Sequence, residues 1–288
     1  MVSAYEKRIR EVYPELTITN SKMNEIGQNN DVLIVNGSLV FRFPKYREGI
    51  RKLKKETSVL EGIKGNIPLA VPYPIYQSLE PEEVGMVFTG YRLVEGSPLW
   101  PGVLIENEEH HEQIASRLVD FLTALHSQSI DSMNIEKKSI GDIRSSIEDL
   151  YDRFKEKLFP HMNERAKVEV SHHFDSFLSK NELPGFQPAL THGDFGASNI
   201  LWDPERHEVS GIIDFGEAEV GDPAYDFAGL LSSYGEHFVR RCLEKYPNGD
   251  RILDRMNFYR GTFALQEALH GIENDDPVAF ENGMKGYR

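Results

Sequence analysis

Two short stretches decide the fold of this chain: residues 190–202 read LTHGDFGASNILW, and residues 212–216 read IIDFG. Asp194 can accept a proton from a hydroxyl group, and Asn199 and Asp214 offer the oxygen ligands that Mg²⁺ prefers. Strand-forming residues flank a polar turn at 203–206, and such a pattern is typical of a hairpin. The hairpin would bring Asn199 and Asp214 to one edge, as a metal ion requires.

The order and spacing of these residues match a phosphoryl-transfer site. In protein kinases the catalytic loop supplies an Asp and, five residues later, an Asn, and a separate Asp-Phe-Gly turn supplies a second metal ligand. Asp194 and Asn199 have this offset, and Asp214 begins an Asp-Phe-Gly. Each motif alone also occurs in ordinary turns, but their joint order favours the kinase-like interpretation. We therefore predict Asp194 as the catalytic base and Asn199 and Asp214 as Mg²⁺ ligands, while His192 should pack and hydrogen-bond within the loop.

The bulk composition is that of an ordinary globular protein. The 288 residues suffice for two lobes with buried cores, and 40% of them are hydrophobic and 27% charged. One cysteine, Cys242, excludes an intrachain disulfide. No apolar run approaches the roughly 18 residues that a membrane span needs. We expect a cytoplasmic monomer with no membrane partner.

Nearly all of the negative charge lies in the second part of the chain. Residues 1–100 hold 13 Lys and Arg against 12 Asp and Glu, whereas residues 101–288 hold 19 against 34. This imbalance argues against nucleic acid as a partner, because a phosphate backbone needs a basic face. An acidic second part suits a cationic small-molecule substrate. A solvated acidic surface that keeps the chain soluble explains the same charge.

The first hundred residues predict a small antiparallel sheet that holds a nucleotide. Runs of strand-forming residues at 31–35 and 39–43 flank Asn36-Gly37, a strong hairpin signal. Residues 16–20 and 85–93 also predict strands. The polar turn 26–30 would cover the nucleotide phosphates through Gly27, Asn29 and Asn30, although an ordinary turn between strands explains this stretch as well.

A cation on the third strand should reach the phosphates. Arg42 stands where protein kinases place a Lys, and its guanidinium can fork to two phosphate oxygens. Lys45 is the second candidate for this cation. Residues 47–62 predict a helix on which Glu56 would pair with Arg42, unless Glu56 is an exposed acid beside Lys52.

A break at 94–98 predicts a hinge between two lobes. We expect residues 1–94 to form the nucleotide-binding lobe and residues 95–288 the catalytic and substrate-binding lobe, in an α+β two-lobed kinase-like fold. The adenine ring would bind the backbone of Arg92 and Val94. Apolar residues at helical spacing predict helices at 107–127, 142–159 and 168–183 in the second lobe.

With these motifs in view, most of the chain resembles the aminoglycoside phosphotransferase family of small-molecule kinases. The resemblance rests on residues 190–202, on 212–216, on the GDPAYDFA run at 221–228 and more loosely on residues 42–44. It implies Asp194 as the base, Mg²⁺ held by Asn199 and Asp214, and ATP or GTP as the phosphate donor. It also implies that Asp222 and Asp226 have structural roles, with Asp226 ordering the loop. Many members have Lys in place of Arg42.

Other features narrow the acceptor to a small molecule. No long activation segment and no Ala-Pro-Glu follow Asp214, which disfavours a protein kinase. Aminoglycosides are polycations, so we predict Glu217, Glu236 and Glu267 as acceptor-binding carboxylates, although each could be a surface acid. Residues 263–272 and 280–283 loosely resemble the branch that phosphorylates a 2″-hydroxyl.

The function that we predict is transfer of the terminal phosphate of ATP or GTP to a hydroxyl of an aminoglycoside. A kinase for macrolides or for an endogenous amino alcohol or sugar is the first alternative, because the motifs define the reaction better than the acceptor. A non-catalytic nucleotide-binding pseudokinase is the second, and the intact set of Asp194, Asn199 and Asp214 speaks against it.

Overall fold

The computed structural model describes residues 2–24, 30–179 and 186–288 and confirms the α+β kinase-like fold class. Contacts divide the chain into a first unit of residues 1–135 with 192–219 and a second unit of residues 136–191 with 220–288. This division differs from the boundary at residue 94, which concerned the roles of the two lobes and stays a prediction.

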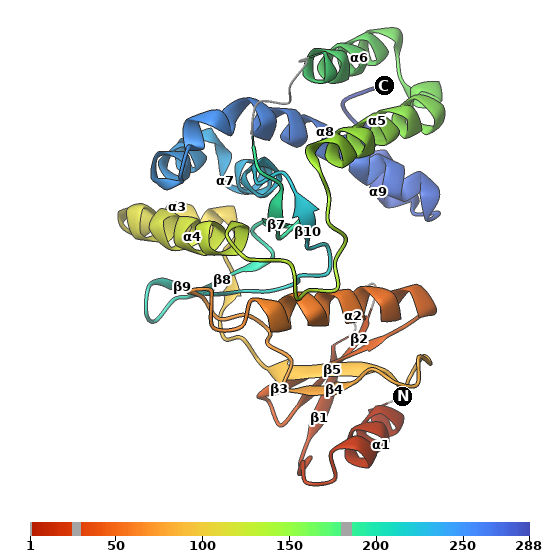
Figure 1. Cartoon of the computed structure of the whole chain (residues 1–288), viewed down its shortest axis with the longest axis vertical. Helices are drawn as coiled ribbons and strands as arrows, with labels where there is room; N and C mark the ends of the chain where they lie inside the picture. The colour runs from red at the N-terminus through yellow and green to blue at the C-terminus, as the bar shows by residue number, and fades with distance from the viewer. Residues whose placement is uncertain (1, 25–29, 180–185) are drawn as a thin grey trace. The chain divides into compact units, whose positions relative to one another are not determined.

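The first unit begins with a helix and a five-stranded antiparallel sheet of order β1-β2-β3-β5-β4 (Figure 1). Its elements in this region are α1 (Val2–Val12), β1 (Ser21–Asn24), β2 (Asn30–Val35), β3 (Leu39–Pro44), α2 (Arg47–Gly62), β4 (Tyr76–Ser78) and β5 (Phe88–Arg92). The predicted hairpin joins β2 and β3. Asn36 and Gly37 have φ of 52° and 66°, the left-handed conformation that such tight turns need.

The two faces of the sheet contact different elements, because neighbouring side chains of a strand point to opposite sides. On one face, Phe41 and Phe43 of β3 pack with Ile9 of α1 in a fully buried apolar cluster. On the other face, Arg42 lies on the same side as α2. The predicted helix at 47–62 is confirmed as α2, and its apolar residues Ile50 and Leu53 are buried with Val87.

One predicted strand is wrong. Residues 16–20 form no strand, and β1 starts at Ser21. The side chain of Asn36 explains the difference, because its Oδ1 accepts from the backbone N–H groups of Thr19 and Asn20 and its Nδ2 donates to the carbonyl of Thr17. These backbone groups are therefore satisfied by a side chain instead of a strand ladder. The strand predicted at 85–93 is present as β5 but begins only at Phe88.

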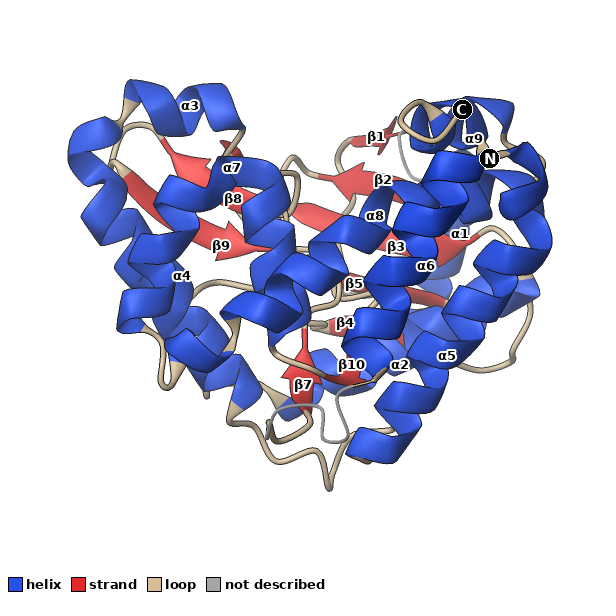
Figure 2. Cartoon of the chain, turned by 90° about the horizontal axis from the view of Figure 1, so that it is seen from above, coloured by secondary structure: helices blue, strands red, loops and turns tan. Residues whose placement is uncertain are grey.

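The rest of the first unit carries residues 192–202 of the first sequence motif and all of the second, residues 212–216. It contains β6 (Ser97–Pro98), α3 (Pro101–Glu106), η1 (Glu108–His110), α4 (His111–His126), β8 (Ile200–Asp203) and β9 (Glu208–Ile212). Strands β6, β8 and β9 form a second sheet in that order, and α4 packs against β9 (Figures 1 and 2). The predicted hairpin around 203–206 is confirmed as β8 and β9. The helix predicted at 107–127 begins as the short 3-10 turn η1 and becomes α-helical only at His111.

The second unit is mainly helical. Its elements are α5 (Ile140–Lys157), η2 (Phe159–His161), α6 (Glu164–Leu178), β7 (Ala189–Thr191), β10 (Glu219–Gly221), α7 (Ala224–Lys245), η3 (Gly249–Arg251), α8 (Leu253–Glu273) and α9 (Pro277–Met284), with β7 and β10 paired. Two helices, α5 and α6, begin a few residues earlier than predicted because side chains cap their N-termini. Ser139 and Asp142 form a capping box before α5, and the side chain of Asn163 accepts from Ala166 N at 2.8 Å to begin α6. Among the helices that the structure describes, none has the length and apolar character of a membrane span.

Candidate active site

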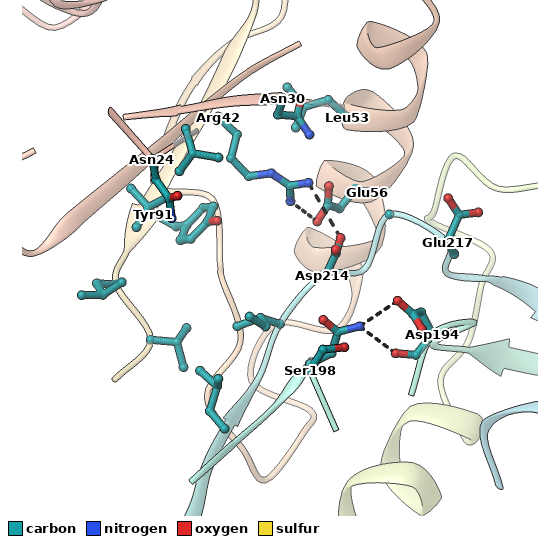
Figure 3. A pocket seen from close by; sticks show the side chains of 18 of the residues that line it. Asn24, Asn30, Arg42, Leu53, Glu56, Tyr91, Asp194, Ser198, Asp214 and Glu217 are labelled. Carbon is teal, nitrogen blue, oxygen red and sulfur yellow. Dashed lines mark hydrogen bonds and ion pairs between the residues drawn. The ribbon is translucent and has the colours of Figure 1, made fainter. Parts of the chain in front are cut away.

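The first unit contains a cavity of about 850 Å³ that the sheet, α2 and both sequence motifs line (Figure 3). Its charged lining residues are Arg42, Lys52, Glu56, Asp194, Asp214 and Glu217. Apolar side chains of the sheet, among them Val32, Ile34 and Val40, form another part of the wall. A cavity of this size with a few converging polar groups is typical of a small-molecule site.

Arg42 and Glu56 form the ion pair that the sequence predicts. Arg42 Nη1 donates to Glu56 Oε1 at 2.6 Å, and Arg42 Nη2 lies 3.8 Å from Asp214 Oδ1 (Figure 3). Burial alone would lower the pKa of the Arg42 guanidinium, but the negative charges of Glu56 and Asp214 outweigh it and raise that pKa above its ordinary value. Arg42 is therefore a fixed cation between α2 and the Asp-Phe-Gly turn.

Asn199 holds Asp194 from two sides. Its Nδ2 donates to the backbone carbonyl of Asp194 at 2.9 Å and to Asp194 Oδ2 at 2.8 Å. Both hydrogen bonds use the amide nitrogen, so the amide oxygen of this buried residue is the atom that can bind a cation. The five-residue offset thus orients together a carboxylate and an amide oxygen that can bind a metal ion.

The protein raises the pKa of Asp194. Surrounding protein removes part of the hydration of this carboxylate, which raises its pKa, and the nearby charges of Asp214 and Glu217 act in the same direction. The hydrogen bond from Asn199 and the neighbouring His192 oppose this effect. A carboxylate with a raised pKa is a stronger base, as proton transfer from a hydroxyl requires.

His192 fixes the loop from inside. Its side chain is fully buried, and Nδ1 accepts from the backbone N–H of Asp194 at 3.3 Å. Nε2 lies 3.1 Å from the carbonyl of Ile213, so it carries the proton and donates. This histidine ties the loop of Asp194 to the residue before Asp214, and its ring lies tilted against that of Phe215, with the ring centroids 4.7 Å apart.

The Asp-Phe-Gly turn approaches the same loop closely. Asp214 has a φ of 65°, a left-handed conformation that is uncommon for any residue except glycine and often marks a functional site. Gly193 has a φ of 80°, and a Cβ there would lie 2.4 Å from the carbonyl oxygen of Glu217. Only glycine fits this contact between the two loops.

The donor set suits a divalent cation shared with a ligand. Asn199 offers an amide oxygen and Asp214 an exposed carboxylate, and both line the cavity. No three His, Cys, Asp or Glu side chains in the described part of the chain gather as a metal site. Mg²⁺ prefers oxygen ligands and is usually held by one or two protein groups together with substrate phosphates, so these residues fit that ion.

Lys52 is a cavity residue that sequence reasoning did not select for the site. Its Nζ donates to Glu217 Oε1 at 2.9 Å, and the pKa of Lys52 is raised chiefly by this hydrogen bond. Lys52 precedes Glu56 by one helical turn on α2, which places both residues on one face of the helix. That spacing was the available signal, but Glu217, 165 positions away, could not be assigned from it.

The remaining predicted nucleotide-binding residues divide into three groups. Asn30 and Val94 line the cavity, as do Tyr91 and Asn24, which were not predicted. Arg92 is exposed at the end of β5 and is not among the lining residues. Gly27 and Asn29 lie outside the described residues. Lys45, the second candidate for the phosphate cation, is not a lining residue either, and its Nζ lies 3.9 Å from Asp31 Oδ1.

The other predicted residues belong to the second unit. Asp222 is buried and accepts from Arg255 Nε at 2.7 Å and from Ala224 N at 2.9 Å, while Asp226 is fully buried in the first turn of α7. Glu236 is exposed on α7 and pairs with Arg240, and Glu267 is exposed on α8. The acceptor-binding roles of Glu236 and Glu267 stay predictions.

Comparison with known proteins assigns the family. A sequence model described as the phosphotransferase enzyme family (APH) matches residues 23–259. This match spans most of the chain, which therefore belongs to the phosphotransferase enzyme family. The protein is a phosphotransferase with an alcohol group as acceptor.

Individual relatives extend over the whole chain. Viomycin phosphotransferase of Streptomyces vinaceus is 26% identical over 296 residues, which cover 100% of this chain and 99% of the relative. The solved structure of the GDP and kanamycin complex of APH(2″)-IIIa matches with a TM-score of 0.87 at 24% identity, covering 98% of this chain and 96% of that chain. Macrolide 2′-phosphotransferase type I matches with a TM-score of 0.78 at 22% identity, covering 100% and 97%. Both structural likenesses show the fold.

Proposed function

We propose that this phosphotransferase transfers the terminal phosphate of ATP or GTP to a hydroxyl group of a cationic antibiotic, with aminoglycosides as the first candidates. One observation carries the proposal. A single cavity is lined by a carboxylate that can accept a proton, by two oxygen donors for Mg²⁺ and by a fixed cation, which are Asp194, Asn199 with Asp214, and Arg42. These are the parts that phosphoryl transfer requires.

The nucleotide would lie along the sheet. Apolar residues Val32, Ile34 and Val40 offer a surface for the base, and the backbone near Val94 offers hydrogen-bonding groups. Arg42, held by Glu56, would contact the phosphate oxygens with the guanidinium nitrogens that Glu56 does not use. The fixed position of Arg42 avoids the entropy loss of ordering a free side chain on binding.

Asn199 and Asp214 would hold Mg²⁺ together with phosphate oxygens. Bound there, the ion supplies neutralisation of the charge that develops on the transferred phosphate. The acceptor hydroxyl would hydrogen-bond to Asp194, whose Oδ2 is already oriented by Asn199. Asp194 then takes the hydroxyl proton as the oxygen attacks the terminal phosphorus and the nucleoside diphosphate leaves. Positioning supplies most of the catalysis in such a reaction.

The acceptor class rests on charge and on the relatives. Residues 101–288 carry 34 acidic against 19 basic residues, which favours a cationic acceptor. A full-length relative is named for viomycin, and a structure of the same fold was solved with kanamycin. A macrolide kinase is the second candidate, because macrolide 2′-phosphotransferase type I shares this fold over the whole chain. The pseudokinase alternative gains no support, since the matching family is described as one of phosphotransferase enzymes.

A turnover assay with ATP or GTP tests the proposal. Kanamycin, viomycin, a macrolide and simple amino alcohols serve as acceptors, and the phosphorylated acceptor is detected by mass spectrometry. We expect transfer to a cationic antibiotic, and an Asp194→Ala variant should lose about 10²–10⁴-fold in kcat while it still binds nucleotide. Asp203→Ala is the matched control, because Asp203 lies on β8 outside the cavity lining. Full activity of Asp194→Ala would refute the mechanism, and turnover of macrolides alone would transfer the assignment to the second candidate.

A further inference from the structure

We propose that the carboxylate of Glu217 is the subsite for an ammonium group of the acceptor, and that Lys52 occupies this subsite until the acceptor arrives. The inference rests on the proposed function and deepens it, because it names how a cationic acceptor is recognised beside the base. It also gives Lys52 a second position, on the phosphates of the nucleotide.

The structure already shows an ammonium group on Glu217. Lys52 Nζ lies 2.9 Å from Glu217 Oε1, the distance of a charge-assisted hydrogen bond. An acceptor ammonium has the same charge and the same donors as the lysine head group. The carboxylate of Glu217 can therefore form the same ion pair with an ammonium group of a cationic antibiotic.

Glu217 is well placed for this role because its backbone is anchored next to the base. The contact of its carbonyl with Gly193 leaves no room for a Cβ, and Gly193 directly precedes Asp194. Glu217 and Asp194 both line the cavity (Figure 3). An ammonium bound to Glu217 would therefore bring the hydroxyl groups of the same molecule close to Asp194.

The ion pair between Lys52 and Glu217 is exposed to water, so another cation can replace Lys52 in it. The side chain of Lys52 is 43% exposed and that of Glu217 is 58% exposed. Pairs this open to water change an equilibrium by a factor of about five or less, because solvent screens them and two flexible side chains must be held. A polycation that adds contacts elsewhere can displace one lysine at little cost.

Lys52 has a second destination when it is displaced. It lines the same cavity as Arg42, and it lies one turn from Glu56 on the same face of α2. A lysine ammonium on its flexible stem is a mobile point charge, unlike the fixed guanidinium of Arg42. Released from Glu217, Lys52 can turn toward the triphosphate. Acceptor binding would then strengthen nucleotide binding, and reciprocity requires the converse.

Two variants of the one ion pair separate this exchange from a simple structural link. Lys52→Met removes the competitor for Glu217, so the acceptor Kd should fall by about threefold. The same variant should lower kcat by about tenfold, because Lys52 no longer reaches the phosphates. Glu217→Gln removes the subsite and should raise the acceptor Kd by about tenfold. The two variants thus move acceptor affinity in opposite directions.

Calorimetry with kanamycin and viomycin measures the acceptor Kd, and a fluorescent nucleotide analogue measures donor affinity with and without acceptor. We expect acceptor to tighten nucleotide binding in the wild type and not in Lys52→Met. Lys54→Met is the matched control, since Lys54 also lies on α2 and pairs with Glu80 and Glu82 but does not line the cavity. It should leave all of these quantities unchanged.

The outcomes distinguish this inference from the proposed function. If both variants weaken acceptor binding, or if Lys52→Met leaves it unchanged, the pair is only a structural link and the exchange is refuted, even if the wild type phosphorylates the antibiotic. If the opposite shifts occur but no acceptor is phosphorylated, the subsite stands and the proposed reaction fails. If the wild type binds no cationic acceptor, both are refuted.

Discussion

Two ion pairs of this protein use the same chemical groups in different surroundings. Arg42 and Glu56 pair in the cavity of the first unit, with side chains 15% and 3% exposed. Arg255 and Asp222 pair in the second unit, with side chains 3% and 1% exposed. Both are arginine–carboxylate pairs with short N–O distances of 2.6 and 2.7 Å.

The two pairs differ in how many of their hydrogen-bonding groups are already engaged by other protein groups. Asp222 also accepts from Ala224 N and from the hydroxyl of Tyr259, and Arg255 donates to the carbonyl of Arg251 and lies over the ring of Phe186. The Asp222–Arg255 pair therefore has its hydrogen-bonding groups engaged within its own unit.

Arg42 also hydrogen-bonds to Tyr91, but it faces a cavity and approaches a second carboxylate only to 3.8 Å, at Asp214. Part of its charge is still available to a ligand. The comparison teaches that burial alone does not identify a functional ion pair. The remaining bonding capacity toward a cavity distinguishes Arg42–Glu56 and supports its proposed role in nucleotide binding.

The comparison is tested most severely by Arg255→Met. We expect a loss of about 3–5 kcal/mol in the free energy of unfolding, because the carboxylate of Asp222 would stay buried without its partner. Urea unfolding measures this loss. Catalytic activity per folded molecule should be unchanged at low temperature, and Arg251→Met, on an exposed neighbour, is the control. A loss below about 1 kcal/mol would show that the core pair is not structural.

Arg42→Lys should give the next largest effect, on ligand binding instead of folding. Lysine keeps the charge near Glu56 but lacks the planar fork that serves Glu56 and a phosphate together. We expect nucleotide Kd to rise about tenfold, or ~1.4 kcal/mol. Titration with a fluorescent nucleotide measures it, and urea unfolding should change little. Unchanged nucleotide affinity with a large loss of stability would place Arg42 in the same class as Arg255.

The smallest effect should be a shift in the pH dependence of kcat/KM in Glu217→Gln, separate from the weaker acceptor binding expected of this variant. Asp194 must be ionised to act as a base, so kcat/KM falls as the pH drops through its pKa. The negative charge of Glu217 helps to raise that pKa, together with loss of hydration and Asp214, while Asn199 and His192 oppose it. Removing the charge lowers the pKa, so the acid limb should move to lower pH. Glu205→Gln, on the exposed turn after β8, should leave the limb in place, and an equal shift in both variants would contradict the assignment.

Local patterns in the sequence predicted much of the cavity. The offset of Asp194 and Asn199, the Asp-Phe-Gly at Asp214 and the helix at 47–62 are short-range features, and the structure forms the helix, both hairpins and the Arg42–Glu56 contact. Arg42 could be linked to Glu56 because strand and helix are neighbours in the chain. The catalytic roles of these residues are still predictions.

Long-range contacts could not be predicted from the sequence. Lys52 and Glu217 meet across 165 positions, and no local pattern encodes that meeting. The strand expected at 16–20 failed because the side chain of Asn36 binds the backbone there, a competition that alternation of residues does not reveal. Helix α1 and strand β4 were not predicted, and their places depend on contacts such as those of Tyr13 with Gln77. The surroundings of the predicted acceptor-binding acids, Glu217, Glu236 and Glu267, likewise depend on tertiary packing, which local sequence patterns do not reveal.

The first unit is discontinuous along the chain, and this has a consequence for biosynthesis. Arg42 and Glu56 leave the ribosome early, whereas Asp194 and Asp214 follow only after residues 136–191, which belong to the second unit. At about 5–20 residues per second, a nascent chain would hold its N-terminal sheet for several seconds without the motifs that complete the cavity wall. A fragment that stops at residue 135 would therefore carry the sheet that lines the cavity but not Asp194 or Asp214, so a complete first unit requires translation to continue at least through residue 219.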